Sequence, residues 1–192
     1  MQTSPNSINH HDNPVIAETQ AWIEKAVIGL NLCPFAKSVY VKQQIRYVVS
    51  AANDVAVLAA ELEAELLALQ AADPVKTDTT LLILPDTLGD FLDYNDFLTV
   101  ADNLLEELEL DGDIQIASFH PDYQFAGTVA DDIENYTNRS PYPILHLLRE
   151  ASIERAVDAF PEAEMIFEKN METLRKLGHQ GWQALNLKPE NR

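Results

Sequence analysis

The sequence predicts a single α/β domain built on a small, mainly parallel sheet of three or four strands. Segments with strand patterns alternate with segments of helical periodicity in the order strand, helix, strand, helix, strand. This order is typical of parallel strands joined by right-handed crossovers. One strand is an unbroken apolar run, as expected where both faces of a sheet are covered. A ferredoxin-like α+β sheet uses some of the same pieces and is the alternative.

The first elements follow from the spacing of apolar residues. Over 14–32 they recur every third or fourth position, which predicts a helix that ends before Pro34. Apolar and more polar residues alternate over 44–50, which predicts a strand with one buried face. Helical spacing returns over 53–72 and stops before Pro74.

The middle of the chain continues the alternation. The apolar run over 80–84 predicts a central strand. A second long helix is predicted over 90–110, with Gly112 just past its end, and a third strand over 114–119. An irregular stretch follows over 120–138.

The ends of the chain complete the predicted organisation. Helices are expected to resume at Pro141 and over 161–176, where they would cover an exposed face or edge of the sheet. The polar start, 1–13, predicts a disordered leader. No repeat or linker divides the remainder, so we expect one domain over 14–185.

Composition limits the function classes. The net charge of -18 disfavours nucleic acid and anionic membranes as partners, because both would repel it. No apolar run is long enough to span a bilayer. Cys33 is the only cysteine, which excludes an internal disulfide and suits a reducing, cytoplasmic location. The chain has no Lys or Arg between Thr77 and Asn138, so any anionic ligand must be held by cations from elsewhere.

The loop after the third predicted strand is a candidate site. In open parallel sheets, ligands bind where the carboxyl ends of the strands diverge. That rule selects His120, Asp122 and Tyr123, in which an imidazole and a carboxylate could act as acid and base or as metal ligands. A purely structural alternative is that Asp122 caps a turn while His120 packs against Tyr123.

A second candidate lies at the helix predicted from Pro141. Ser140 would be its N-cap, and the free N–H groups beside Arg139 would attract an anion. Helical spacing puts several polar side chains on one face of this helix. They are Tyr142, His146, Arg149 and Glu150. An ordinary solvated helix face is the alternative.

Cys33 is the third candidate. It lies where the first helix ends, and Lys37 could lower the pKa of its thiol to make a nucleophile. A buried, unreactive cysteine is the alternative, because free cysteines are among the most buried residues.

Three motifs give the chain a resemblance to a known family. They are Gly-Leu-Asn-Leu-Cys-Pro-Phe-Ala (29–36), Ser-Phe-His-Pro-Asp-Tyr-Gln-Phe (118–125), and Asn-Arg-Ser-Pro-Tyr-Pro with the His-Leu-Leu-Arg-Glu that follows (138–150). Through them the chain resembles the bacterial domain of unknown function 1415 family. The resemblance implies no activity, but its motifs are the same three segments that the physical reasoning selects.

Two functional hypotheses follow. The first is an enzyme that acts on a small anionic metabolite in a crevice lined by the three segments. Its roles would be His120 or His146 as general base, Asp122 as orienting partner, Arg139 and Arg149 as anion clamp, and Cys33 as nucleophile. In a variant, Zn²⁺ or Fe²⁺ lies between His120, Asp122 and His146, with Cys33 or Glu150 as a further ligand. The second hypothesis is a non-catalytic module that binds a ligand or a basic protein partner. The oligomeric state is left open.

Overall fold

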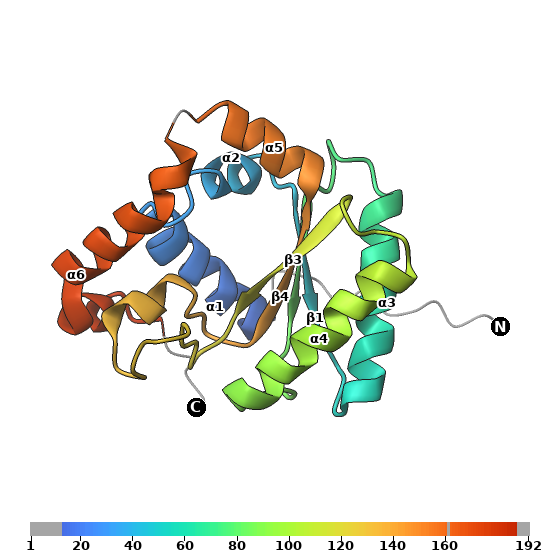
Figure 1. The fold of residues 1–192 in the computed structure, drawn as a ribbon, viewed down its shortest axis with the longest axis horizontal. Coiled ribbons are helices and arrows are strands. Elements are labelled where there is room, and N and C mark those ends of the chain that lie inside the picture. Colours follow the sequence, from blue (N-terminus) through green and yellow to red (C-terminus); the bar gives the residue numbers. More distant parts are fainter. Residues whose placement is uncertain (1–12, 161, 188–192) are drawn as a thin grey trace.

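A four-stranded sheet lies between two layers of helices (Figure 1). The computed structural model describes residues 13–160 and 162–187. The predicted disordered leader therefore lies outside the described residues, except for Asn13, whose side chain caps the first helix.

The sheet mixes parallel and antiparallel pairs. Its strands are β1 (Ile45–Val49), β2 (Thr79–Ile83), β3 (Ile114–Phe119) and β4 (Ile144–Arg149), in the order β1-β2-β4-β3. β1 and β2 are parallel, and β4 is antiparallel to both of its neighbours, β2 and β3. β1, β2 and β3 thus run in one direction, and β4 lies between β2 and β3 in the opposite direction. The predicted α/β class is confirmed, but the predicted mainly parallel sheet is wrong.

The helix predicted from Pro141 is also wrong, because residues 144–149 form β4 in the interior of the sheet. Leu145 and Leu147 point to one face, and His146 points to the other. Both faces are covered, so β4 lacks the regular change between apolar and polar residues that marks a half-exposed strand. Such a short apolar run is ambiguous between helix and strand, and here pairing with two neighbouring strands decides it.

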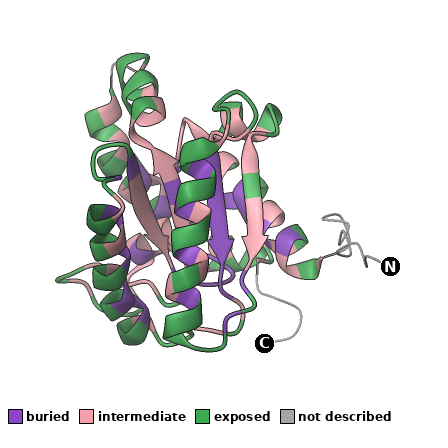
Figure 2. Cartoon of the chain, turned by 90° about the vertical axis from the view of Figure 1, so that its right-hand side faces the viewer, coloured by how far each residue is buried: buried purple, intermediate pink, exposed green. Residues whose placement is uncertain are grey.

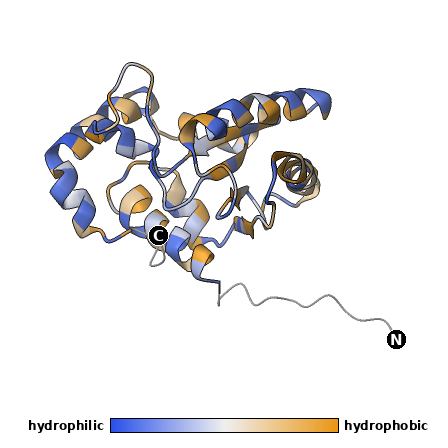
Figure 3. Cartoon of the chain, turned by 90° about the horizontal axis from the view of Figure 1, so that it is seen from below, coloured by the Kyte–Doolittle hydropathy of each residue, from blue (hydrophilic) through white to orange (hydrophobic). Residues whose placement is uncertain are grey.

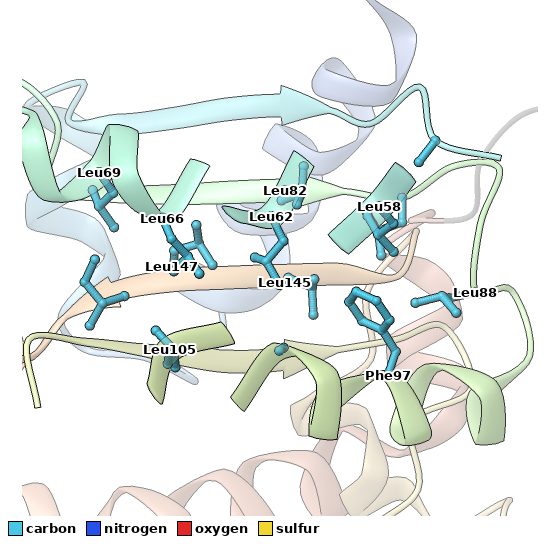
Figure 4. Close-up of a cluster of buried hydrophobic side chains, with 14 of the residues drawn as sticks. Leu58, Leu62, Leu66, Leu69, Leu82, Leu88, Phe97, Leu105, Leu145 and Leu147 are labelled. Carbon is cyan, nitrogen blue, oxygen red and sulfur yellow. The ribbon is translucent and has the colours of Figure 1, made fainter. Parts of the chain in front are cut away.

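Helices α3 (Val55–Ala71) and α4 (Phe91–Glu107) cover one face of the sheet. Asp54 and Asp90 cap them by accepting hydrogen bonds from backbone N–H groups in the first turn. The buried leucines of α3 recur every three or four residues and meet leucines of β2 and β4 (Figure 4). The outer sides of the helices are exposed, whereas the interior of the sheet is buried (Figure 2).

The other face is covered by α1 (Pro14–Trp22), the π-helical segment η2 (Ile23–Ile28), α2 (Ala36–Val41) and α5 (Glu150–Asp158). The predicted helix over 14–32 is therefore an α-helix that continues as a π-helix and ends at a turn. Trp22, Ile23 and Ala26 pack against β2 and β4 and form a second apolar cluster. π-helical segments are rare in proteins, and those that occur are often found at functional sites.

The remaining elements are η3 (Ile133–Thr137), η4 (Ala163–Met165) and α6 (Ile166–Ala184). α6 packs against η3, and the ring centroids of Trp182 and Tyr136 are 5.1 Å apart. A kink divides α6 at Gly178, whose φ of 64° suits a residue without a Cβ. Most helices carry hydrophilic and hydrophobic residues together (Figure 3). Among the described residues, no helix has both the length and the apolar character needed to cross a membrane.

Candidate functional site

A cavity of about 840 Å³ lies on the sheet face opposite α3 and α4. Its floor consists of side chains from all four strands. They are Ile45 of β1, Thr79 and Leu81 of β2, Gln115, Ala117 and Phe119 of β3, and His146 and Leu148 of β4. Successive strand residues point to opposite faces, so every second residue reaches this floor and the residues between them face α3 and α4.

Two short helices form much of the wall above this floor. No residue of α2 or α5 is buried. Apolar side chains such as Val39 of α2 and Ile153 of α5 line the cavity. The ring of Phe35, just before α2, meets that of Phe160, just after α5, edge to face at 5.9 Å. The cavity wall is therefore mainly apolar.

The polar rim of the cavity lies at the end of the sheet where β1 and β2 begin. Ser152 Oγ donates to Asp78 Oδ1 at 2.6 Å, and Arg155 Nη2 donates to Ser152 Oγ at 2.9 Å. Lys42, which precedes β1, also lines the cavity. Within the described part of the chain, neither Lys42 nor Arg155 forms an ion pair, and Asp78 is the one acidic residue of the lining.

His146 lies in the middle of the floor, between Leu81 of β2 and Ala117 of β3. Its Nε2 is 2.8 Å from Thr79 Oγ1, and the Thr79 hydroxyl donates to the Leu147 carbonyl at 2.5 Å. That hydroxyl has a single proton, so Nε2 of His146 must carry the proton of the first bond. Burial of the ring disfavours its charged form and lowers the pKa of His146 to about 4. The imidazole is therefore neutral at physiological pH.

Cys33 lines the same cavity from the turn before α2. Burial raises the pKa of its thiol, and the backbone N–H groups of Phe35 and Ala36 offset part of the increase. The predicted lowering by Lys37 is wrong, because Lys37 is exposed, lies outside the cavity lining and does not contribute to this shift. Cys33 is thus a protonated thiol at neutral pH.

His120 lies on the other face of the sheet, buried against α4. Its Nδ1 accepts the backbone N–H of Asp122 at 3.0 Å, and its Nε2 is 3.1 Å from the Leu88 carbonyl. Its ring packs against those of Phe91 and Tyr94. His120 thus accepts a hydrogen bond from the backbone N–H of Asp122, and the Asp122 residue is exposed. The predicted acid and base roles of this pair stay a prediction.

Arg139 forms hydrogen bonds with the loop that follows β3. Its Nε donates to the Tyr123 carbonyl at 3.3 Å, and its Nη2 to the Ala130 carbonyl at 2.6 Å. Its guanidinium lies 4.2 Å from the centre of the Tyr136 ring. Ser140 precedes a strand, so it is not the predicted N-cap, and its hydroxyl bonds the Tyr142 carbonyl at 2.5 Å.

Arg149 is committed to the end of α3. Its Nη2 donates to the carbonyls of Leu69 and Ala72, the latter at 2.8 Å. Tyr142 is buried, and its hydroxyl donates to Glu18. Glu150 begins α5, and its backbone N–H donates to the Asp113 carbonyl at 3.0 Å. The helical face predicted to unite these side chains does not exist.

Cys33 and His146 are thus the predicted site residues that the structure brings into one cavity. The others lie outside its lining: Lys37, His120, Asp122, Tyr123, Arg139, Ser140, Tyr142, Arg149 and Glu150. The sequence analysis missed Lys42, Asp78, Thr79, Ser152 and Arg155. Ser152 and Arg155 are one helical turn apart. A helix predicted from Glu150 instead of Pro141 would have placed them on one face.

A family model matches residues 14–184, and its description reads protein of unknown function, DUF1415. The chain belongs to the DUF1415 family. No curated protein and no solved structure matches it significantly. The family resemblance of the three motifs is thereby confirmed.

In this DUF1415 member, the hypothesis of a metal site can be compared with the positions of the possible ligands. Among the described residues, no three His, Cys, Asp or Glu side chains come together to hold an ion. His120 and His146 lie on opposite faces of the sheet, so they cannot share one ion. What the cavity offers instead is an apolar surface, one neutral imidazole and two cations at the rim.

Proposed function

We propose that this protein binds a small organic acid with an apolar body in the cavity beneath α2 and α5. The observation that carries the proposal is the cavity itself, whose volume of about 840 Å³ is lined mainly by apolar side chains. Ligand sites are commonly mainly apolar cavities of about 300–1,000 Å³ with a few placed polar groups. A cytoplasmic location, where Cys33 would stay reduced, is part of this proposal.

The charges at the rim support an acidic ligand. The whole chain carries a net charge of -18, so its surface as a whole repels anions. The cavity lining, however, contains two cations, Lys42 and Arg155, and a single acidic residue, Asp78. Asp78 accepts the hydroxyl of Ser152, and Arg155 has guanidinium N–H groups beyond the one bonded to Ser152. A carboxylate or phosphate at the rim would therefore meet favourable charge.

The side chains in the cavity support binding better than catalysis. Cys33 has a raised pKa, so it is a weak nucleophile at neutral pH. His146 has a pKa of about 4, so it is a weak base and cannot act as a general acid at neutral pH. Among the described residues, no carboxylate forms a hydrogen bond with its ring, and its Nε2 is bonded to Thr79.

An enzyme is the second candidate, on one specific observation. Cys33 and His146 line the same cavity, although they come from distant parts of the chain. In such an enzyme, His146 would take the proton of the Cys33 thiol, and the thiolate would add to an acyl carbonyl of the ligand and expel a leaving group, which would receive that proton. That reaction requires a bound ligand to reverse the effect of burial on the Cys33 thiol.

Calorimetric titration of the full chain with decanoate tests the binding function. Decanoate combines an apolar chain with a carboxylate, and its methyl ester has the same chain without the charge. We expect decanoate to bind one to one and more tightly than the ester. Ala156→Trp, which places an indole in the cavity, should weaken binding by at least about tenfold.

Val157→Trp is the matched control, because Val157 is on the same helix, is 42% exposed and lies outside the cavity lining. It should bind as the wild type does. Absence of binding to the wild type by both decanoate and aromatic acids such as cinnamate, or equal decanoate binding by the Ala156→Trp variant, would refute the proposal.

A further inference from the structure

The hydrogen bonds of His146 determine what its free ring nitrogen can do. Thr79 gives its only proton to the Leu147 carbonyl, so Nε2 of His146 is the donor to Thr79. In a neutral imidazole the other nitrogen then carries a lone pair and no proton. Nδ1 of His146 is therefore an acceptor, and the Thr79 hydroxyl, which is bonded to the Leu147 carbonyl, holds it in that state.

This acceptor has no hydrogen-bond partner among residues 13–160 and 162–187. No described residue forms a hydrogen bond with Nδ1 of His146, although the residue lines the cavity. Its neighbours in the sheet, Leu81 and Ala117, have no polar side-chain atoms to offer. An acceptor that is dehydrated without a partner costs about 1–3 kcal/mol. A ligand that covers the floor must supply a donor or leave Nδ1 unsatisfied.

We infer that the cavity selects organic acids whose apolar body carries a hydroxyl or N–H group, which donates to Nδ1 of His146. The inference rests on the proposed function and specifies the class of ligand. It makes His146 a specificity-determining residue and Thr79 a positioning residue that acts through it.

The same lone pair fixes the orientation of the ligand. A carboxylate has only acceptor atoms, so it would be repelled by Nδ1 of His146. The acid group therefore lies at the rim with Lys42 and Arg155, and the donor lies deeper. His146 pairs with Leu81, two residues along β2 from Thr79 and three from Asp78 at the rim. At about 3.3 Å per strand residue, the backbone of Asp78 is roughly 10 Å from that of Leu81, and a ligand that reaches from the rim to the middle of the floor spans a distance of up to this order.

Three related acids test this inference by calorimetry at neutral pH. Cinnamate has an aromatic body and a carboxylate but no donor. Para-hydroxycinnamate adds a hydroxyl at the far end of the molecule, and para-methoxycinnamate places an oxygen there that can only accept. We expect the hydroxyl compound to bind the wild type about tenfold more tightly than the methoxy compound, the effect of one satisfied acceptor.

Variants locate that preference. His146→Phe should bind cinnamate and lose the preference for the hydroxyl compound. Thr79→Val removes the group that holds the imidazole and should reduce the preference, whereas Thr79→Ser keeps the hydroxyl and should retain it. Nitrogen NMR of the ring provides a measurement without ligand, in which the wild type should show His146 protonated at Nε2.

The outcomes separate this inference from the proposed function. Cinnamate binding without any gain from the hydroxyl, or a His146 ring protonated at Nδ1, overturns the inference and leaves the binding function standing. Failure of all three acids and of decanoate to bind overturns both. A preference for the hydroxyl that persists in His146→Phe assigns the acceptor to another group and also overturns the inference.

Discussion

Nη2 of Arg149 donates to the Ala72 carbonyl at 2.8 Å and thereby ties the end of β4 to the end of α3. The same atom also donates to the carbonyl of Leu69. The last carbonyls of a helix have no partner within it, so a cation there satisfies them and interacts well with the helix dipole. Arg149 is therefore a structural residue.

Substitution of Arg149 tests this role. Arg149→Ala should lower the free energy of unfolding by about 2–4 kcal/mol, because it removes the side-chain donor to the partly buried carbonyls of Leu69 and Ala72. Arg149→Lys should lower it less, because a single ammonium keeps the charge but not the fork of donors. Urea unfolding measures both. An anion clamp would behave in the opposite way, with normal stability and weakened binding of decanoate.

The pH dependence of stability reports on His146. Its pKa is about 4 in the folded protein against 6.5 for the ordinary group. Between these values the unfolded chain holds more protons, so the free energy of unfolding falls as the pH drops from about 6.5 to 4. The His146 contribution is up to about 3 kcal/mol. His146→Leu should show a shallower fall in urea unfolding over this range, and an identical slope would contradict the burial of a neutral imidazole.

Removal of the rim charges should weaken binding of an acid. Lys42→Gln and Arg155→Gln should each reduce the affinity for decanoate by about two- to fivefold, because exposed charges contribute modestly. The affinity for the methyl ester should not change. Lys37→Gln is the control. Lys37 lies in α2, which ends just before Lys42, but it is outside the cavity lining. An equal effect of all three substitutions would point to the overall charge of the protein instead of the rim.

The reactivity of Cys33 separates a binding protein from a thiol enzyme. With its raised pKa, Cys33 should react with iodoacetamide more slowly than free cysteine at neutral pH. Bound decanoate should slow the reaction further, because the thiol lines the cavity. Mass spectrometry of the intact chain follows the labelling. A reaction faster than that of free cysteine would support the enzyme candidate.

Periodicity predicted the elements whose burial is simple. α3 and α4 each present one row of apolar residues to the sheet, and β2 is buried along its whole length, so their patterns are unambiguous. β4 could not be recognised in this way. Its two faces meet different surroundings, a leucine core on one side and a cavity on the other, and the run from Ile144 to Leu148 therefore fits both a strand and a helix.

Only some of the residues of the candidate site could be predicted from the sequence. His146 was selected as a helical residue and Cys33 as part of a turn, and both reach the cavity. Arg139 and Arg149 were selected because cations are scarce in the chain, but both are bonded to backbone carbonyls. The expectation that ligands bind at the carboxyl ends of strands pointed to His120, whereas the polar rim lies at the other end of β1 and β2.

The sequence by itself determined the α/β class, most of the elements and the family, because these depend on local patterns and continuous motifs. Only the tertiary structure decided that β4 lies between β2 and β3, which arginines are occupied, and which side chains share a cavity. Those outcomes depend on pairing between segments far apart in the chain. A side chain becomes available to a ligand only after backbone and core have taken the partners they need.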